Sequence, residues 1–221
     1  MQGSNIFGNH LLGKAPANEA DERLKAIKED MADTQPIGSI LNLCKTYDQG
    51  NALLKFIDII TEKKFRTTVS LTAARGRGKS AALGLSIAAA LAYGYANIFV
   101  TSPSPDNLGT LFEFVLKGLD ALKYDQNSDY DIIQSTQDDM KKAIVRINLM
   151  RDHRQTVQYI DPSDHKMLAQ AELVVIDEAA AIPLPLVKNL LGPYLVFMSS
   201  TVNGYEGTGR SLSLKLLDNL R

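Results

Sequence analysis

The sequence lacks several features that would place a protein in a special class. Its 221 residues include a single cysteine, Cys44, so an internal disulfide is excluded and a reducing compartment is expected. Cys44 stands among apolar residues, which predicts a small core residue rather than a nucleophile. The three histidines are widely spaced and have no cysteine neighbours, so the sequence contains no zinc motif. The formal net charge of −1 gives no sign of a nucleic-acid binder, and any such surface must be local.

A membrane-spanning run and an N-terminal leader are also lacking. The longest uncharged stretch, 81–105, is interrupted by glycine and proline, and its helical part, 81–95, is too short to cross about 30 Å of hydrocarbon. The N-terminus does not show the basic-then-apolar order of a signal peptide. With 45% hydrophobic residues the chain has an ordinary globular composition and enough length for a sizeable core. We therefore expect a soluble, intracellular protein.

The most informative stretch runs from Val69 to Leu83 and has the layout of a strand, a glycine-containing turn and an alanine-rich helix. It contains the sequence Ala73-x-x-x-x-Gly78-Lys79-Ser80, which matches the phosphate-binding pattern G-x-x-x-x-G-K-[ST] except at its first glycine. Glycine lets backbone N–H groups wrap around a phosphate at the start of a helix. Lys79 can then reach the β- and γ-phosphates, and the Ser80 hydroxyl can hold Mg²⁺. The alternative is an ordinary glycine turn before a buried helix.

A second motif lies at 172–179, where four apolar residues, 173–176, are followed by two acids. A continuous apolar run of this length indicates a strand buried on both faces, as in the centre of a parallel sheet. Asp177 can hold Mg²⁺, and Glu178 can orient or deprotonate an attacking water. Adjacent acids at the end of a buried strand are costly without a cation partner. Acids that begin a helix are the structural alternative.

Other polar residues have a functional interpretation, and for most of them a structural alternative exists. Gln49 opens a helical stretch upstream of the phosphate loop, where a glutamine amide can hold adenine or simply be solvated. Thr101–Ser102 ends a strand, where helicases touch the nucleic-acid backbone, although a plain turn explains it equally well. Ser199–Thr201 ends another strand, where helicase-type ATPases sense the γ-phosphate. A solvated turn or a phosphate contact explains the basic cluster formed by Arg151, His153 and Arg154.

The alternation of strands and helices predicts a three-layer α/β fold with a mostly parallel sheet. Residues 1–16 are predicted to form an irregular tail, and 124–142 to form a loop with a short helix. Helices are expected at 18–31, 37–60 (interrupted at 46–50), 81–95, 106–122 and 211–221. Strands are expected before the phosphate loop and at 97–103, 143–148, 156–160, 172–177 and 195–198.

Four segments together resemble the ATPase module of the RNA cytidine acetyltransferases: 71–83, 99–107, 174–186 and 204–210. The similarity extends from about Asp33 to the end of the chain. It implies a RecA-like helicase fold (35–221) that follows a tail and surface helix (1–34). It assigns the carboxylate roles to Asp177 and Glu178. It also implies that ATP is bound by Arg75, Gly76, Arg77, Gly78, Lys79, Ser80 and Ala81.

In that family, ATP hydrolysis supports transfer of acetyl from acetyl-CoA to the cytidine amine of small-subunit ribosomal RNA and tRNA. The resemblance therefore implies RNA as a partner, along with adaptor or ribosome-assembly proteins but no membrane. It implies a nucleolar location in a eukaryote and a cytoplasmic one otherwise. Family members are several times longer, so a second RecA-like half and the acetyltransferase domain are expected beyond Arg221.

The glycine-rich segment 204–210 resembles an acetyl-CoA loop only superficially, since Gly204 stands where arginine or glutamine is required. A hinge loop is the alternative there, and Arg210 has no assigned role. Two other functions fit the same motifs: a RecD-type translocase, and a nucleotide-gated RNA-binding module that does not hydrolyse ATP.

Overall fold

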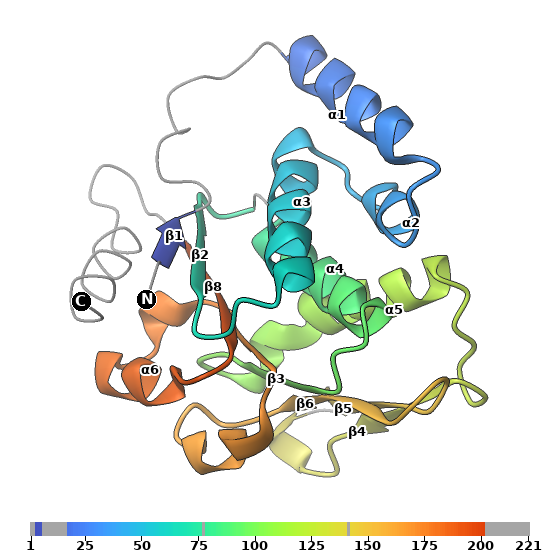
Figure 1. The fold of residues 1–221 in the computed structure, drawn as a ribbon. Helices are drawn as coiled ribbons and strands as arrows, with labels where there is room; N and C mark the ends of the chain where they lie inside the picture. The colour runs from blue at the N-terminus through green and yellow to red at the C-terminus, as the bar shows by residue number, and fades with distance from the viewer. Residues whose placement is uncertain (1–2, 6–16, 77, 141, 202–221) are drawn as a thin grey trace.

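The computed structural model describes residues 3–5, 17–76, 78–140 and 142–201 (Figure 1). Its strands form one sheet in the order β1-β2-β8-β7-β3-β6-β5-β4. Neighbours from β1 to β6 are parallel, whereas β6, β5 and β4 pair antiparallel. The strands are β1 (Gly3–Asn5), β2 (Thr68–Ala73), β3 (Asn97–Thr101), β4 (Tyr130–Gln134), β5 (Ile144–Leu149), β6 (Gln155–Tyr159), β7 (Leu173–Ile176) and β8 (Leu195–Thr201).

Helices cover both faces of the sheet, so the predicted three-layer α/β fold is confirmed (Figure 1). The residues of β7 are all apolar because the strand is buried on both faces. Leu173 and Val175 face one core cluster, and Val174 and Ile176 face the other. The first cluster includes residues of α3, α4 and α5, and the second includes residues of α6. The helices are α1 (Ala17–Met31), α2 (Ile37–Leu41), α3 (Tyr47–Glu62), α4 (Lys79–Ala92), α5 (Gly109–Ala121) and α6 (Leu184–Leu190).

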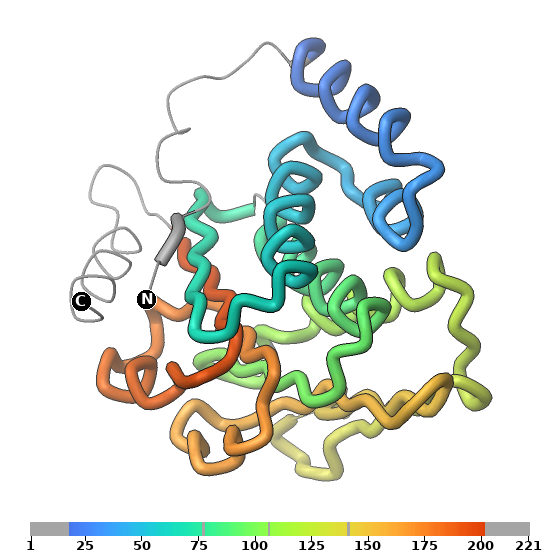
Figure 2. Tube along the Cα trace, in the orientation of Figure 1, coloured from blue at the N-terminus to red at the C-terminus, as the bar shows by residue number. Residues whose placement is uncertain are grey.

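Helix α4 lies between the sheet, α3 and α5, as the chain trace in Figure 2 shows. It is apolar all round because nearly every residue in it is buried. Its close approach to α5 depends on glycine: a Cβ on Gly84 would lie 2.3 Å from the Leu111 carbonyl oxygen. This packing fixes the N-terminus of α4, where the phosphate loop ends.

Helices α1 and α2 lie outside α3, away from the sheet (Figures 1 and 2). The α1 residue Leu24 joins the main core, and Lys28 donates hydrogen bonds to the carbonyl oxygens of Asn42 (3.3 Å) and Cys44 (2.7 Å). The predicted surface helix is thereby attached to the connection between α2 and α3. Within the described ranges, no helix is both long and apolar enough to cross a membrane.

Two predictions of irregular structure are wrong. Residues 3–5 form the edge strand β1, which pairs with β2 through backbone hydrogen bonds that need no particular side chain. Part of 124–142 forms β4, which pairs antiparallel with β5. Strand β4 is a mostly exposed edge strand, and its sequence YDIIQ has neither a regular polar–apolar alternation nor a continuous apolar run. The segment 204–210 and the expected helix 211–221 lie outside the described residues.

Candidate functional site

The chain turns from β2 into α4 through a loop that depends on two glycines. Gly76 and Gly78 have φ angles of 79° and 78°, in the left-handed region that glycine adopts without a steric penalty. Gly78 is the N-cap of α4, and no side chain caps this helix. The first N–H groups of α4 are therefore not used by a capping side chain, and the helix dipole favours an anion at this end. This is the geometry that the phosphate-loop prediction requires.

Lys79 is the first residue of α4 and is only 7% exposed. Its ammonium group turns back over the loop and donates to the carbonyl oxygens of Ala73 and Ala74, both at 3.3 Å. Burial lowers the pKa of Lys79, while the carboxylates of Glu178 and Asp177 act in the opposite direction. A buried cation that is held by neutral carbonyl groups is well placed to exchange them for phosphate oxygens.

Asp177 joins the second motif to the phosphate loop. Its side chain is almost completely buried, and its Oδ2 atom accepts a hydrogen bond of 2.7 Å from the Ser80 hydroxyl. Its Oδ1 atom accepts a hydrogen bond from the Ser199 hydroxyl. Burial raises the pKa of Asp177, although the hydrogen bonds from Ser199 and Ser80 act against this shift. The sequence places Ser80 and Asp177 far apart, and the fold brings them into direct contact.

These two residues fit a magnesium ion. The Ser80 hydroxyl, at the start of α4, and the Asp177 carboxylate, after the buried strand β7, are in contact with each other. Both can offer an oxygen atom as a ligand to a metal ion. Mg²⁺ prefers one or two such protein ligands beside phosphate oxygens and water. Within the described ranges, no lysine or arginine forms an ion pair with Asp177. The buried carboxylate would therefore gain from a cation partner.

Glu178 lies at a sharp turn after β7. Its φ angle is 52°, which is uncommon for a residue other than glycine and is often found at functional sites. Its N–H group donates to Asp177 Oδ1 and to the Ser199 hydroxyl, both at 3.1 Å. Its carboxylate accepts a hydrogen bond from the Thr201 hydroxyl, at 2.8 Å and 3.0 Å from its two oxygens. The turn therefore directs the carboxylate towards β8.

The position of β8 explains these contacts. This strand lies between β2 and β7, and Thr201 is level with Ala73 at the end of β2. Ser199 and Thr201 alternate along β8 and hold one acid each. The sequence predicted that this strand end lies near the γ-phosphate, but it did not indicate that the strand's hydroxyl groups contact the two acids. The period-two spacing was visible in the sequence, whereas the strand order was not.

Gln49 also lies at the phosphate loop. It is in the first turn of α3, where its N–H group donates to the capping Thr46 hydroxyl at 3.2 Å. Its Oε1 atom accepts the Lys45 N–H at 2.9 Å. Its Nε2 atom lies so close to the loop that a Cβ built on Gly78 would be 1.9 Å away. The fold therefore brings this predicted residue beside the other loop residues.

Of the remaining loop residues, Arg75 is exposed and Ala81 is buried at the start of α4, while Arg77 lies outside the described residues. The strand-end hydroxyls of Thr101 and Ser102 donate to the backbone oxygens of Ile160 and Ser104. The structure thus uses both hydroxyls within the fold.

The basic cluster is far from this site. His153 forms a 3.1 Å hydrogen bond with the Gly94 carbonyl oxygen, just past the C-terminal end of α4. The Arg151 guanidinium lies over the Tyr124 ring at 4.5 Å from its centre. The phosphate loop precedes the N-terminus of the same helix, so the two features lie at opposite ends of α4.

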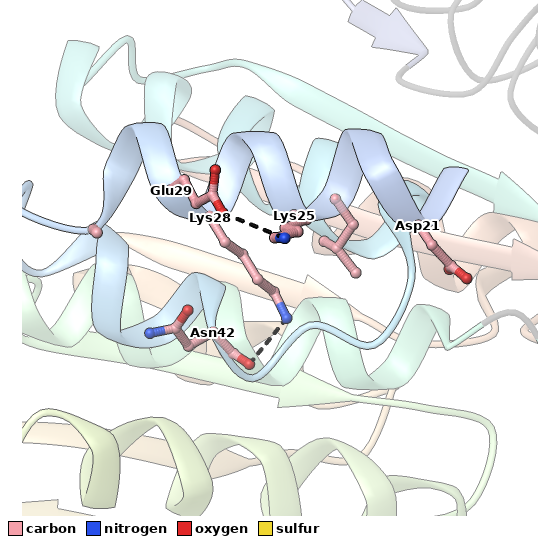
Figure 3. Close-up of a pocket in the computed structure, with 7 residues that line it drawn as sticks. Asp21, Lys25, Lys28, Glu29 and Asn42 are labelled. Atoms are coloured by element: carbon pink, nitrogen blue, oxygen red, sulfur yellow. Dashed lines mark hydrogen bonds and ion pairs between the residues drawn. The ribbon is translucent and has the colours of Figure 1, made fainter. Parts of the chain in front are cut away.

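A surface pocket of about 530 Å³ lies between α1 and the loop that follows α2 (Figure 3). Lys25 and Glu29 form an ion pair of 3.9 Å on its rim. None of the predicted site residues lines it. The pocket is lined by Asp21, Leu24, Lys25, Lys28, Glu29, Ala32 and Asn42.

Comparison with solved structures gives distant similarity. The chain aligns with the large terminase ATPase domain of Thermus phage P74-26 with a TM-score of 0.46 and 16% sequence identity. This alignment covers 66% of the chain and 64% of the terminase domain.

Comparison with curated proteins and family models is far more specific. The chain is 68% identical to the RNA cytidine acetyltransferase of Homo sapiens over 202 residues, which is 91% of this chain and 20% of that protein. It is 66% identical to the Saccharomyces cerevisiae enzyme of the same name over 212 residues, again 20% of the relative. The chain thus spans about a fifth of the length of these relatives. Residues 70–221 match the family model described as "RNA cytidine acetyltransferase NAT10/TcmA, helicase domain", so the chain belongs to this enzyme family and corresponds to its helicase domain.

Proposed function

We propose that this chain binds Mg-ATP and hydrolyses it as the helicase-like module of an RNA cytidine acetyltransferase. The observation that carries the proposal is the 2.7 Å hydrogen bond between Ser80 and Asp177. It joins the end of the phosphate loop to a buried acid from a distant part of the chain. An ordinary turn and acids that merely begin a helix do not predict this contact.

In this proposal the loop N–H groups and Lys79 bind the phosphates. Ser80 and Asp177 would hold Mg²⁺, which when bound supplies positive charge to the phosphate oxygens. Glu178 orients the attacking water and accepts its proton, and Thr201 fixes the direction of the Glu178 carboxylate. Gln49 stands at the same loop, where its amide is placed to meet the nucleotide.

In the complete protein we propose that ATP hydrolysis supports transfer of acetyl from acetyl-CoA to cytidine in RNA. The names of the relatives support RNA and cytidine as the target. We propose small-subunit ribosomal RNA and tRNA as the substrates and, in a eukaryotic cell, the nucleolus as the location. The remaining four-fifths of the relatives' length leaves room for the acetyltransferase and a second RecA-like half.

Calorimetric titration with Mg-ATP, followed by phosphate release from the same samples, tests the proposal. The chain should bind ATP and release phosphate slowly. Lys79→Ala should bind at least tenfold more weakly because a charge-assisted contact to the phosphates is lost. Asp177→Asn should release phosphate more slowly than the unchanged chain. Lys188→Ala, which removes an exposed lysine on α6, is the matched control and should behave like the unchanged chain.

Three results would each have a distinct meaning. Binding without turnover would support a nucleotide-gated module instead of an ATPase. Equal losses in Lys79→Ala and Lys188→Ala would mean that the loop does not bind the phosphates. A folded chain that binds no ATP would refute the proposal for this chain.

A further inference from the structure

The side chain of Gln49 lies against the glycine that ends the phosphate loop. Gly78 has a positive φ angle and is the N-cap of α4. A Cβ at this position would be 1.9 Å from Gln49 Nε2 and 2.9 Å from its Cδ. Gly78 therefore supplies the backbone angle, and any side chain there would displace the Gln49 amide. Gly76 differs, since apart from its own chain neighbours no atom lies within 4 Å of a Cβ built there.

The other end of this amide is fixed. The Lys45 N–H donates to Gln49 Oε1 at 2.9 Å, so the amide presents its Nε2 donor group to Gly78. The Thr46 hydroxyl caps the backbone of the same helical turn. These contacts orient the side chain from α3 towards the loop.

The first turn of α3 is itself held in place by α1 and α2. A Cβ on Gly50, the residue after Gln49, would be 2.9 Å from Ile27 Cδ1 and 3.3 Å from Leu24 Cδ1. The Leu41 side chain lies 3.4 Å from the same point. Gln49 thus connects a tightly packed part of the molecule to the end of the phosphate loop at Gly78.

This geometry gives the Gln49 amide a contact with the loop that does not depend on adenine. Reading adenine requires both the donor and the acceptor of the glutamine amide. Here Oε1 accepts one hydrogen bond from the Lys45 N–H, and Nε2 lies beside Gly78. Because Oε1 can accept a second hydrogen bond, contact with the loop and reading of adenine are compatible, and only ligands with different bases separate the two roles.

We propose that Gln49 is a positioning residue that holds the phosphate loop at Gly78, and that it promotes binding of any triphosphate regardless of the base. The inference rests on the proposed function, since it requires the loop to bind phosphates. It assigns to Gln49 a role in loop geometry rather than in selection of ATP.

The test is calorimetric titration of the chain and Gln49→Ala with three ligands, each with Mg²⁺: ATP, GTP and inorganic tripolyphosphate. Loss of the amide also removes the hydrogen bond from the Lys45 N–H that anchors it. It should weaken all three by a similar factor, about three- to tenfold, which is the size of one typical hydrogen bond. A loss confined to ATP would overturn the inference and establish adenine reading. Equal affinity of Gln49→Ala and the unchanged chain for all three ligands would also overturn it.

Two further variants separate positioning from packing. Gln49→Glu keeps the shape and the acceptor for Lys45 but replaces the donor at Gly78 with a negative charge. Positioning through contact of the amide nitrogen with Gly78 predicts that Gln49→Glu binds all three ligands at least as weakly as Gln49→Ala, whereas recovery of binding would overturn that role. Asn51→Ala, on the same helix, is the matched control and should bind like the unchanged chain.

Failure of the inference differs from failure of the proposed function. If the unchanged chain binds none of the three ligands, the proposed function fails and the inference fails with it. If the unchanged chain binds and loses affinity in Lys79→Ala but not in Gln49→Ala, only the inference fails. Thermal unfolding of each variant without ligand should match the unchanged chain, so that weaker binding is not a consequence of unfolding.

Discussion

Replacement of Gly118 by alanine should destabilise the protein, although alanine is the better helix former. Gly118 lies in α5 and faces α4, where a Cβ would be 2.4 Å from the Cβ of Ala88. That distance is about 1 Å shorter than ordinary contact, which begins at 3.4 Å. The Ala88 Cβ is fixed by its own backbone and cannot rotate away. The helices themselves would have to separate.

The two opposing effects can be compared. Alanine in place of glycine inside a helix contributes about 1 kcal/mol of stability. An extra carbon forced into a packed core costs about 1–3 kcal/mol. Because the contact is with a rigid group, we take the upper part of this range and expect a net loss of about 1–2 kcal/mol. At this chain length that corresponds to about 2–8 °C in melting temperature.

Urea unfolding followed by far-ultraviolet circular dichroism measures this loss. Gly109→Ala is the matched control, because Gly109 is the first residue of α5 and no atom lies within 4 Å of its Cβ position. This control should be neutral or slightly stabilising. The double variant Ala88→Gly with Gly118→Ala restores the space, so it should be more stable than the sum of the single effects predicts, by about 1 kcal/mol or more.

A stable Gly118→Ala variant would refute the reasoning. If its unfolding midpoint equals or exceeds that of Gly109→Ala, the two helices do not meet at this glycine. An additive double variant would have the same meaning. Either result would undermine the description of how α5 fixes the position of α4 and of the phosphate loop that precedes it.

Three further predictions concern the Glu178 carboxylate and the buried Cys44 thiol. Thr201→Val should lower the rate of ATP hydrolysis about tenfold or more with little change in ATP affinity, because it removes a hydrogen bond to the Glu178 carboxylate. Thr110→Val, at an exposed residue, is the control. Unchanged turnover in Thr201→Val, or an equal fall in Thr110→Val, would contradict the prediction. Burial raises the pKa of Cys44 from 9.0 to about 12, so at pH 8 the thiol should react with a disulfide reagent only as fast as the protein unfolds, and immediate labelling of the folded chain would contradict its burial. The pKa of this thiol is higher in the folded protein than in the unfolded one, so the stability that it contributes is fully present below pH 9 and is lost as the pH rises towards 12. Urea unfolding measured across that range should therefore show a smaller decline in stability for Cys44→Ala than for the unchanged chain.

The sequence by itself determined the local parts of the site. Glycine residues at 76 and 78 indicated a left-handed turn, since the backbone requirement depends on residue type alone. The four apolar residues of β7 indicated a strand buried on both faces, because burial on both sides of a sheet removes the alternation of polar residues. The resemblance to RNA cytidine acetyltransferases also rested on short, contiguous motifs, and the matched family confirms it.

Only the tertiary structure decided which of these parts meet. The insertion of β8 between β2 and β7 brings Ser199 and Thr201 to the two acids, and no local pattern encodes the order of strands in a sheet. The edge strands β1 and β4 were missed for the same reason, since backbone pairing with a distant segment defines them rather than their own side chains. Gln49 could be recognised as a candidate from its place before the loop, but its contact with Gly78 exists because α1 and α2 hold the start of α3 beside α4. Residue type and spacing fix the conformation of the phosphate loop and of β7, whereas packing between segments far apart in the chain fixes the edge strands and brings the site residues together.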